Sequence, residues 1–172
     1  MKRIFIVGTS GCGKTTLANN LGSILNIPSI DVDDHYWLPG WQQRDEKEFE
    51  SIITKLAKTD SWVISGNSSK AIIFERCDTI IWLDYSIWRC LYWGLRRSIR
   101  RMMSSETCCG GNYETLGLLF SKSSIFVWII TSFRKRKSKY TQLFSHQQNG
   151  RSYLRFTSPN EVASWIKEMK RN

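Results

Sequence analysis

The feature that most constrains this chain is a glycine-rich segment at residues 8–15, which reads Gly-Thr-Ser-Gly-Cys-Gly-Lys-Thr. It matches the pattern GxxxxGK[ST] in full. A strand-like run at residues 3–7 precedes it, and a helical pattern with one apolar face follows at residues 14–25. Strand, glycine loop and helix in this order predict a loop whose backbone N–H groups surround phosphate oxygens.

This segment assigns a role to particular side chains. Lys14 adds a positive charge near the outer phosphates, and the hydroxyl of Thr15 can ligate Mg²⁺, so ATP and Mg²⁺ are the expected cofactors. Cys12 lies beside a helix N-terminus and Lys14, which predicts a lowered pKa and a thiol that is easily alkylated. The expected phosphate-binding residues are Gly8, Thr9, Ser10, Gly11, Cys12, Gly13, Lys14, Thr15 and Thr16.

Short apolar runs alternate with helix-like segments along the rest of the chain. Continuous apolar runs are typical of strands that are covered on both faces. The alternation predicts an α/β fold with a doubly wound, five-stranded parallel sheet. The further strands are expected at 28–31, 62–64, 79–83 and 153–156, the helices at 45–58 and after a cap at 158–161, and irregular structure at 33–44.

The part of the chain between the fourth and fifth expected strands carries no strand signal. It holds paired arginines and the sequence Cys108-Cys109-Gly110-Gly111, which predicts two helices around a glycine-containing loop. We expect residues 1–172 to form a single domain, with a helical insert at about residues 86–148.

Composition limits the partners. The 25 Lys and Arg exceed the 15 Asp and Glu, and a net charge of +10 favours a polyanionic partner. The five cysteines form neither a disulfide framework nor a paired CxxC pattern, which predicts reduced thiols and a cytoplasmic location. The longest later apolar run, at 125–130, is far below the roughly 20 residues that span a bilayer, so no membrane partner is expected.

Four further segments carry a family resemblance: 37–41, 62–67, 77–84 and 158–161, which read WLPGW, WVISGN, CDTIIWLD and SPNE. With the glycine loop, they make the chain resemble the P-loop nucleoside and nucleotide kinase superfamily. The resemblance is to an adenylate-kinase-related branch labelled DNA topology modulation proteins. It implies an acceptor site beside the glycine loop and an arginine-bearing lid. The implied activity is transfer of the γ-phosphoryl group of ATP to a small acceptor.

Arg97 and Arg101 are the expected lid arginines, because residues four apart share one helix face. Arg96, Arg100 and Arg134 are the next candidates. Phosphoryl transfer places negative charge on several oxygens, and cations on a closing lid stabilise that charge. The alternative is that the arginines form a solvated helix surface.

The sequence Asp31-Val32-Asp33-Asp34 follows the second expected strand, at the edge where doubly wound sheets bind ligands. The resemblance implies that acidic residues here hold Mg²⁺ or accept a proton from the acceptor hydroxyl. Asp33 is therefore the expected catalytic base, and Asp31 joins Thr15 as a metal ligand. The alternative is turn chemistry, which Asp also favours. The catalytic set is Lys14, Arg97, Arg101 and Asp33, and the acceptor-binding set is Asp31, Asp34, Trp41, Gly66 and Asn67.

Two departures from the family pattern leave the acceptor open. Ser65 stands where relatives commonly carry an aspartate that helps hold the metal's water shell. Asp84, at the end of the fourth expected strand, is the alternative acidic residue for this role. The sequence at 66–69 replaces the Gly-Phe-Pro-Arg type motif of true adenylate kinases, so AMP is not the expected acceptor.

Three functions remain open at this point. The first is an ATP-dependent kinase acting on a nucleotide, a nucleoside or a similar small molecule. The second is a nucleic-acid-binding regulator, suggested by the net charge and the basic run at 134–139. The third, a degenerate ATP-binding protein, follows from Ser65. Steep salt dependence would distinguish binding to nucleic acid from binding of ATP by a backbone loop.

Overall fold

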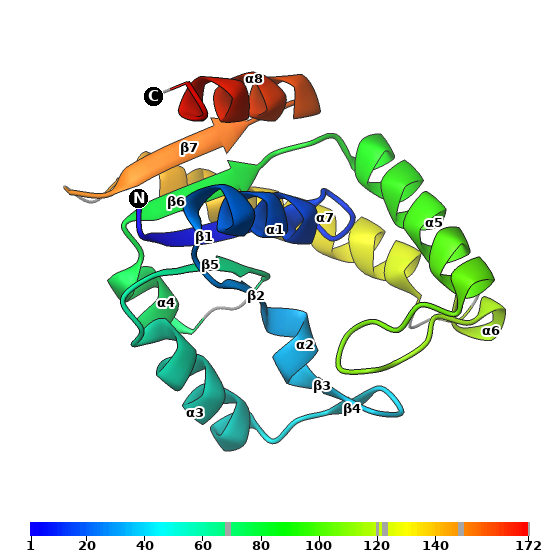
Figure 1. Ribbon diagram of the computed structural model, residues 1–172. Helices are drawn as coiled ribbons and strands as arrows, with labels where there is room; N and C mark the ends of the chain where they lie inside the picture. The colour runs from blue at the N-terminus through cyan, green and yellow to red at the C-terminus, as the bar shows by residue number, and fades with distance from the viewer. Residues whose placement is uncertain (68–69, 120, 122–123, 148–149, 172) are drawn as a thin grey trace.

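Strands and helices alternate along the chain in the computed structural model (Figure 1), which describes residues 1–67, 70–119, 121, 124–147 and 150–171. The strands are β1 (Arg3–Gly8), β2 (Ser29–Asp31), β3 (Trp37–Leu38), β4 (Gln42–Gln43), β5 (Trp62–Ser65), β6 (Thr79–Leu83) and β7 (Ser152–Phe156). The helices are α1 (Lys14–Leu25), α2 (Val32–Tyr36), α3 (Glu46–Ala57), α4 (Ala71–Arg76), α5 (Ile87–Ser104), α6 (Leu116–Leu119), α7 (Ile125–Ser145) and α8 (Pro159–Met169).

The main sheet is five-stranded and parallel, in the order β2-β5-β1-β6-β7. This confirms the predicted fold class. In the register of the sheet, Ser65 at the end of β5 lies opposite Asp31 on one side and Ile6 on the other. The carboxyl ends of β1, β2 and β5 therefore meet at one edge, which is where ligands bind in such sheets.

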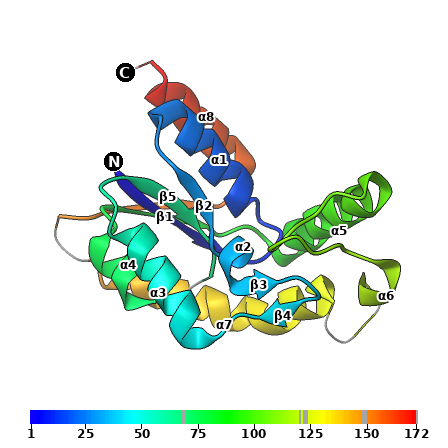
Figure 2. The same ribbon diagram turned by 60° about the horizontal axis from the view of Figure 1, so that its bottom comes forward.

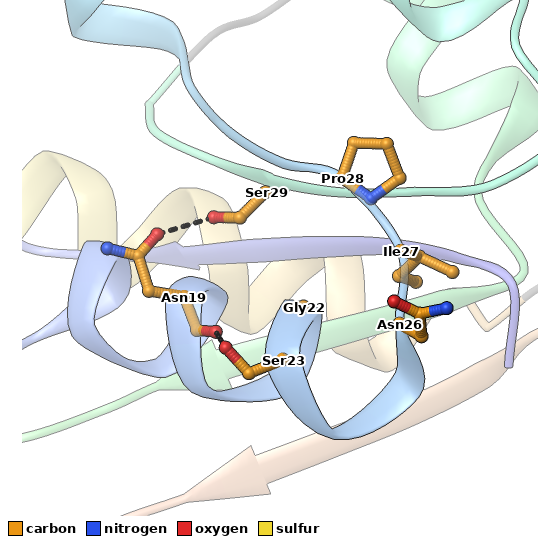
Figure 3. A pocket seen from close by; sticks show the side chains of 7 residues that line it. All are labelled: Asn19, Gly22, Ser23, Asn26, Ile27, Pro28 and Ser29. Atoms are coloured by element: carbon orange, nitrogen blue, oxygen red, sulfur yellow. Dashed lines mark hydrogen bonds between the residues drawn. The ribbon is translucent and has the colours of Figure 1, made fainter.

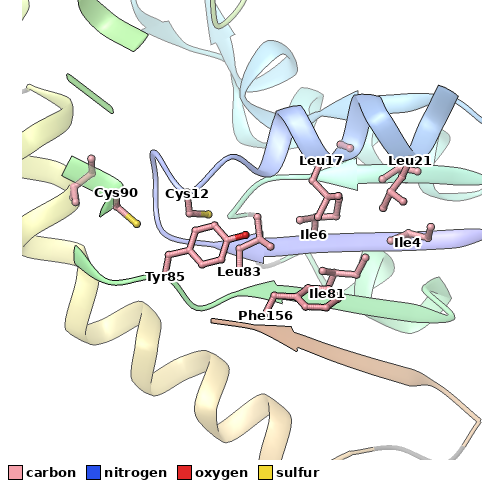
Figure 4. Packing of buried hydrophobic residues seen from close by; sticks show 13 residues of the cluster. Ile4, Ile6, Cys12, Leu17, Leu21, Ile81, Leu83, Tyr85, Cys90 and Phe156 are labelled. Carbon is pink, nitrogen blue, oxygen red and sulfur yellow. The ribbon is translucent and has the colours of Figure 1, made fainter. Parts of the chain in front are cut away.

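Side chains of the central strand alternate between two hydrophobic layers. Ile4 and Ile6 pack with α1 and α8, whereas Phe5 and Val7 pack with α3, α4 and α7. Figure 2 shows these helices on opposite faces of the sheet, and Figure 4 shows Ile4 and Ile6 beside Leu17 and Leu21 of α1. Burying each such side chain stabilises the folded state by about 1.5–3 kcal/mol. Packing on both faces therefore holds the carboxyl ends of the strands in position.

Helix capping explains several element boundaries. Asp45 accepts hydrogen bonds from the N–H groups of Lys47 and Glu48 and so begins α3. Ser158 accepts from Glu161 N–H while Glu161 reaches back to Thr157, a capping box at the start of α8. The predicted caps of both helices are confirmed.

The prediction of irregular structure at 33–44 was wrong in part. Asp31 accepts a hydrogen bond from Asp33 N–H, which starts the short helix α2, and β3 and β4 then form an antiparallel hairpin. The two predicted insert helices are present as α5 and α7, with the unpredicted α6 between them. Within the described residues, no helix is long and apolar enough to cross a membrane.

Candidate phosphate-binding and acceptor site

The glycine loop between β1 and α1 has a backbone that only glycine adopts readily. Gly11 and Gly13 have φ angles of 81° and 90°. A Cβ atom on Gly11 would lie 2.4 Å from the carbonyl oxygen of Cys90. The loop is therefore fixed directly against the first turn of α5.

Lys14 is held inside this loop. Its side chain is largely buried, and Nζ donates hydrogen bonds to the carbonyl oxygens of Gly8 and Thr9, each at 3.1 Å. An ammonium group has three N–H donors. Two of them thus hold the charge within the loop, and the assignment of Lys14 to the outer phosphates stays a prediction.

Thr15 and Asp31 form a pair of oxygen donors at the sheet edge. The Thr15 hydroxyl donates to Asp31 Oδ2 at 2.5 Å, while Asp31 Oδ1 accepts from Asp33 N–H at 3.0 Å. Mg²⁺ prefers oxygen ligands and usually keeps several waters. The pair fits such an ion. Within the described residues, no group of three or more His, Cys, Asp or Glu side chains forms a closed metal site.

Asp33 lies on α2, where both acidic and basic groups of the site act on its charge. Burial and the neighbouring Asp31 raise the pKa of its carboxyl group, and the charges of Lys14 and Arg136 oppose that rise. Asp34 is exposed on the same turn. Asp33 is thus a candidate general base, and this role stays a prediction.

Arg136 contacts the glycine loop. The sequence patterns had predicted Arg97 and Arg101 for this region instead. Arg136 Nη1 donates to Ser10 Oγ at 3.1 Å, and its guanidinium lies 5.1 Å from the ring centroid of Trp128. Burial lowers its pKa. In the sequence, Arg136 belongs to the basic run at 134–139. That run does not show which of its side chains faces the glycine loop.

Arg97 and Arg101 face a different neighbour. Arg101 forms an ion pair with Glu114 at 3.0 Å, and its side chain is 18% exposed. Both arginines act electrostatically on Cys108. The two arginines therefore lie near the segment that follows α5 and carries Cys108 and Glu114. Their role as lid cations stays a prediction.

Gly66 and Asn67 join the end of β5 to the glycine loop. A Cβ atom on Gly66 would lie 2.7 Å from Val32 Cβ, so a side chain here would displace α2. With its amide oriented to satisfy its neighbours, Asn67 donates to Gly8 O at 2.7 Å and accepts from Arg136 Nη1 at 3.0 Å. Ser68 and Ser69 lie outside the described residues.

Ser65 and Asp84 differ in what surrounds them. The Ser65 side chain is buried, and its Oγ has no hydrogen-bond partner among the described residues. Asp84 pairs with Arg155 and lies 3.5 Å from Lys137. Asp84 thus has two cationic partners, and its part as a substitute for the aspartate stays a prediction.

Trp41, a predicted acceptor-binding residue, contacts both the β3–β4 hairpin and the loop that follows α5. Its backbone N–H donates to Asn112 Oδ1 at 2.8 Å, and its indole N–H donates to Tyr113 O at 3.3 Å. Its ring packs edge-on against Trp37, with centroids 5.7 Å apart. Trp41 thus connects the β3–β4 hairpin to the loop that follows α5.

The prediction for Cys12 was wrong. Its thiol is 1% exposed and packs beside Tyr85 (Figure 4), and burial raises its pKa although Lys14 lowers it. The local field of the helix and lysine was inferred correctly. Desolvation outweighs that field because the loop folds the thiol inward.

One surface hollow lies away from this chemistry. A cavity of about 540 Å³ is lined by residues around the end of α1 and the start of β2 (Figure 3). Figure 3 shows only neutral side chains there, with Ser29 donating to Asn19 Oδ1. A second open cavity, of about 590 Å³, lies between Trp41 and residues 111–118 and 121.

Comparisons of sequence match parts of the chain. A family model described as the ATPase family associated with various cellular activities (AAA) matches residues 4–84. The chain is 34% identical over 67 residues to the uncharacterized protein YqaC of Bacillus subtilis (strain 168), covering 38% of each chain. It is 48% identical over 33 residues to a shikimate kinase of Flavobacterium johnsoniae, covering 19% of each. The chain thus matches less than two thirds of the length of these relatives.

Solved structures resemble the chain over nearly its whole length. A shikimate kinase from Acinetobacter baumannii in complex with shikimate has a TM-score of 0.61 at 17% identity, covering 98% of this chain and 92% of that one. A shikimate kinase from Bacteroides thetaiotaomicron gives 0.52 at 19% identity, covering 99% and 96%. Deoxyadenosine kinase from M. mycoides with bound dATP gives 0.50 at 12% identity, covering 98% and 99%.

At these identities, structural likeness shows the fold alone. The comparisons confirm neither the DNA topology modulation label nor a specific relation to adenylate kinases. What they and the geometry establish together is an α/β P-loop NTPase fold of the kind found in small kinases.

Proposed function

We propose that this protein is a kinase that transfers the γ-phosphoryl group of ATP to a hydroxyl group of a small acceptor. The observation that carries the proposal is the place of Asp33 beside the Thr15–Asp31 pair: its N–H donates to Asp31 Oδ1, and the charges of Lys14 and Arg136 act on its carboxyl group. The relatives and structural neighbours that are named shikimate kinase and deoxyadenosine kinase support an alcohol as the acceptor.

The residues divide the chemistry between them. ATP bound with Mg²⁺ supplies the phosphoryl group, and Thr15 and Asp31 would hold the metal. Lys14 and the N–H groups of the glycine loop orient the phosphates, and Arg136 stabilises charge that develops on the transferring group. Asp33 accepts the proton of the acceptor hydroxyl. The acceptor then lies between α2, the β3–β4 hairpin and the turn at 66–67.

The test is ADP release from ATP and Mg²⁺ in the presence of separate nucleosides, nucleotides and hydroxy acids. Release that depends on one acceptor, and that Lys14→Ala abolishes while its circular dichroism spectrum is unchanged, supports the proposal. Release that Lys14→Ala leaves unchanged contradicts it.

Binding to nucleic acid is the second candidate, and one observation favours it. Arg134, Lys135 and Lys139 are exposed along α7, and the chain carries a net charge of +10. If these side chains bind nucleic acid, its affinity falls steeply with salt, while ATP affinity falls much less. The kinase is the function if the protein loses its affinity for DNA or RNA between low and physiological salt and shows acceptor-dependent turnover.

A further inference from the structure

Two adjacent cysteines lie on the loop that follows α5, and the proposed transfer does not use them. Cys108 is buried and Cys109 is half-buried, and both are free thiols. The two residues are neighbours in the sequence, and each thiol shifts the pKa of the other. Adjacent thiols can be oxidised together, because one sulfur can trap the oxidised form of its neighbour.

The surroundings of the pair favour a thiolate at Cys108. The hydrogen bond from Cys109 lowers the pKa of Cys108, and the positive charges of Arg101 and Arg97 act in the same direction. Glu114 opposes them, and its Oε1 accepts a hydrogen bond of 3.9 Å from the Cys108 thiol in its protonated form. The pKa of Cys109 is raised by the same hydrogen bond and by burial. Cys108 is therefore the nucleophile of the pair, since the thiolate is the reactive form.

The loop around the pair is tightly built. Cys108 and Asn112 exchange backbone hydrogen bonds of 2.8 and 2.7 Å, which close the loop. Cys109 has a φ of 46°, in the left-handed region that residues other than glycine rarely adopt. The backbone of Cys108 and Cys109 therefore cannot change without moving the residues next to it, up to Asn112.

The same loop packs on the acceptor side of the site. A Cβ atom on Gly110 would lie 2.0 Å from the carbonyl oxygen of Trp37, so the two backbones are in direct contact. Asn112 donates to Leu38 O at 2.9 Å and accepts from Trp41 N–H. Figure 1 shows the segment after α5 extending toward α2 and β3. The loop therefore holds the hairpin that borders the acceptor.

We propose that Cys108 and Cys109 form a modification site at which a peroxide converts the two thiols into a reversible disulfide that loosens the acceptor side. The Cys108 thiolate attacks one peroxide oxygen, the O–O bond breaks, and the released hydroxide takes up a proton to give water. Cys109 then loses its proton and attacks the sulfenic sulfur, which forms the S–S bond and releases a second water. The sulfurs lose two electrons, and the peroxide gains them.

Geometry makes this disulfide easy to reduce. Neighbouring Cα atoms are about 3.8 Å apart across a trans peptide, which is below the usual range of about 4.4–6.8 Å for disulfides. The bond therefore forms only if the loop backbone changes, and a strained disulfide has a more oxidising potential. Contacts of Gly110 and Asn112 with the hairpin are lost when the loop changes.

The experiment treats the full chain with stoichiometric hydrogen peroxide and then blocks the remaining thiols. Trypsin cleavage after Arg101 and Lys122 releases residues 102–122, which contain Cys108 and Cys109 and no other cysteine. We expect this peptide to lose two hydrogen atoms in mass and to recover them with dithiothreitol. Hydrogen exchange at residues 37–43 should become faster in the oxidised protein. Cys77→Ser is the matched control, because it removes a buried thiol and leaves the pair intact.

Loss of acceptor-dependent turnover on oxidation rests on the proposed function, whereas the mass and exchange measurements do not. We expect turnover to fall at least about tenfold and to recover on reduction, because misplaced acceptors react slowly. Cys109→Ser should form no disulfide and keep slow exchange at 37–43. The proposal is overturned if the peptide 102–122 keeps its hydrogens while other thiols oxidise, or if the disulfide forms without faster exchange. A reduced protein without Lys14-dependent turnover would contradict the proposed function alone.

Discussion

The hydroxyl of Thr15 at the start of α1 donates a hydrogen bond to Asp31 Oδ2 at the end of β2, at 2.5 Å. This contact joins the phosphate loop to the acidic turn that carries Asp33. Two oxygen groups are thereby placed together, and oxygen groups are the ligands that Mg²⁺ prefers.

Asp31→Asn should weaken the affinity for Mg²⁺ more than it weakens the fold. The amide still caps α2 but carries no charge for the metal, so the Mg²⁺ concentration for half-maximal turnover should rise about 10- to 100-fold. A magnesium titration of ADP release measures this. Asp60→Asn, at an exposed turn, is the charge-matched control. An unchanged magnesium midpoint in Asp31→Asn would remove Asp31 from the metal site.

Asp33→Asn should separate activity from stability. Loss of the base should lower turnover about 10²- to 10⁴-fold. The folded-state pKa of Asp33 is raised above its ordinary value of 3.8. The native state therefore binds the proton more tightly, and the free energy of unfolding falls as pH rises from that value through the folded pKa. Above this window Asp33→Asn should melt at a higher temperature than the wild type.

The pH profile gives an independent check of Asp33. Wild-type turnover should fall as pH drops through the raised pKa, because the protonated carboxyl cannot accept a proton. Asp60→Asn should keep this acidic limb. If Asp33→Asn melts below the wild type at neutral pH, the carboxylate is stabilising and its raised pKa is refuted.

Arg136→Ala should lower turnover about 10²- to 10³-fold, the usual loss when one donor to a developing charge is removed. The contact of its Nη1 with Ser10 places the guanidinium at the loop. Lys135→Ala removes an exposed charge from the same helix and should change turnover little. Equal losses in both variants would point to the charge of α7 as a whole rather than to Arg136.

Cys12 should resist alkylation in the folded protein, despite its position in the glycine loop. Burial keeps the thiol protonated and covered. Timed treatment with iodoacetamide and peptide mapping should show modification of the 102–122 peptide before Cys12, and modification of Cys12 only in denaturant. Rapid labelling of Cys12 under native conditions would show that the loop opens.

The main elements of the fold follow from local sequence patterns. The apolar run that forms β6 and the helical period that forms α1 are contiguous signals, so the bounds of both were predicted correctly. The hairpin of β3 and β4 was not predicted, because its strands have two residues each. It is held by long-range contacts, such as that of Asn112 with Leu38, which no local pattern reveals.

The site divides in the same way. The phosphate loop is one contiguous motif, and its backbone geometry and the position of Lys14 fit the predicted phosphate-binding role. Arg136 is separated from Ser10 by 126 positions, and helical spacing shows which arginines share a face without showing which face meets the site. For Cys12, the sequence revealed the nearby charge but not the packing of Tyr85 against the thiol.

The most direct test of the account is to follow the phosphoryl group itself, by mass spectrometry of each acceptor after incubation with ATP and Mg²⁺. The account predicts that one alcohol gains a phosphoryl group with wild-type protein, and that Lys14→Ala gives no such product. ATP hydrolysis to ADP and inorganic phosphate, with no acceptor modified and no effect of Lys14→Ala, would contradict the central claim.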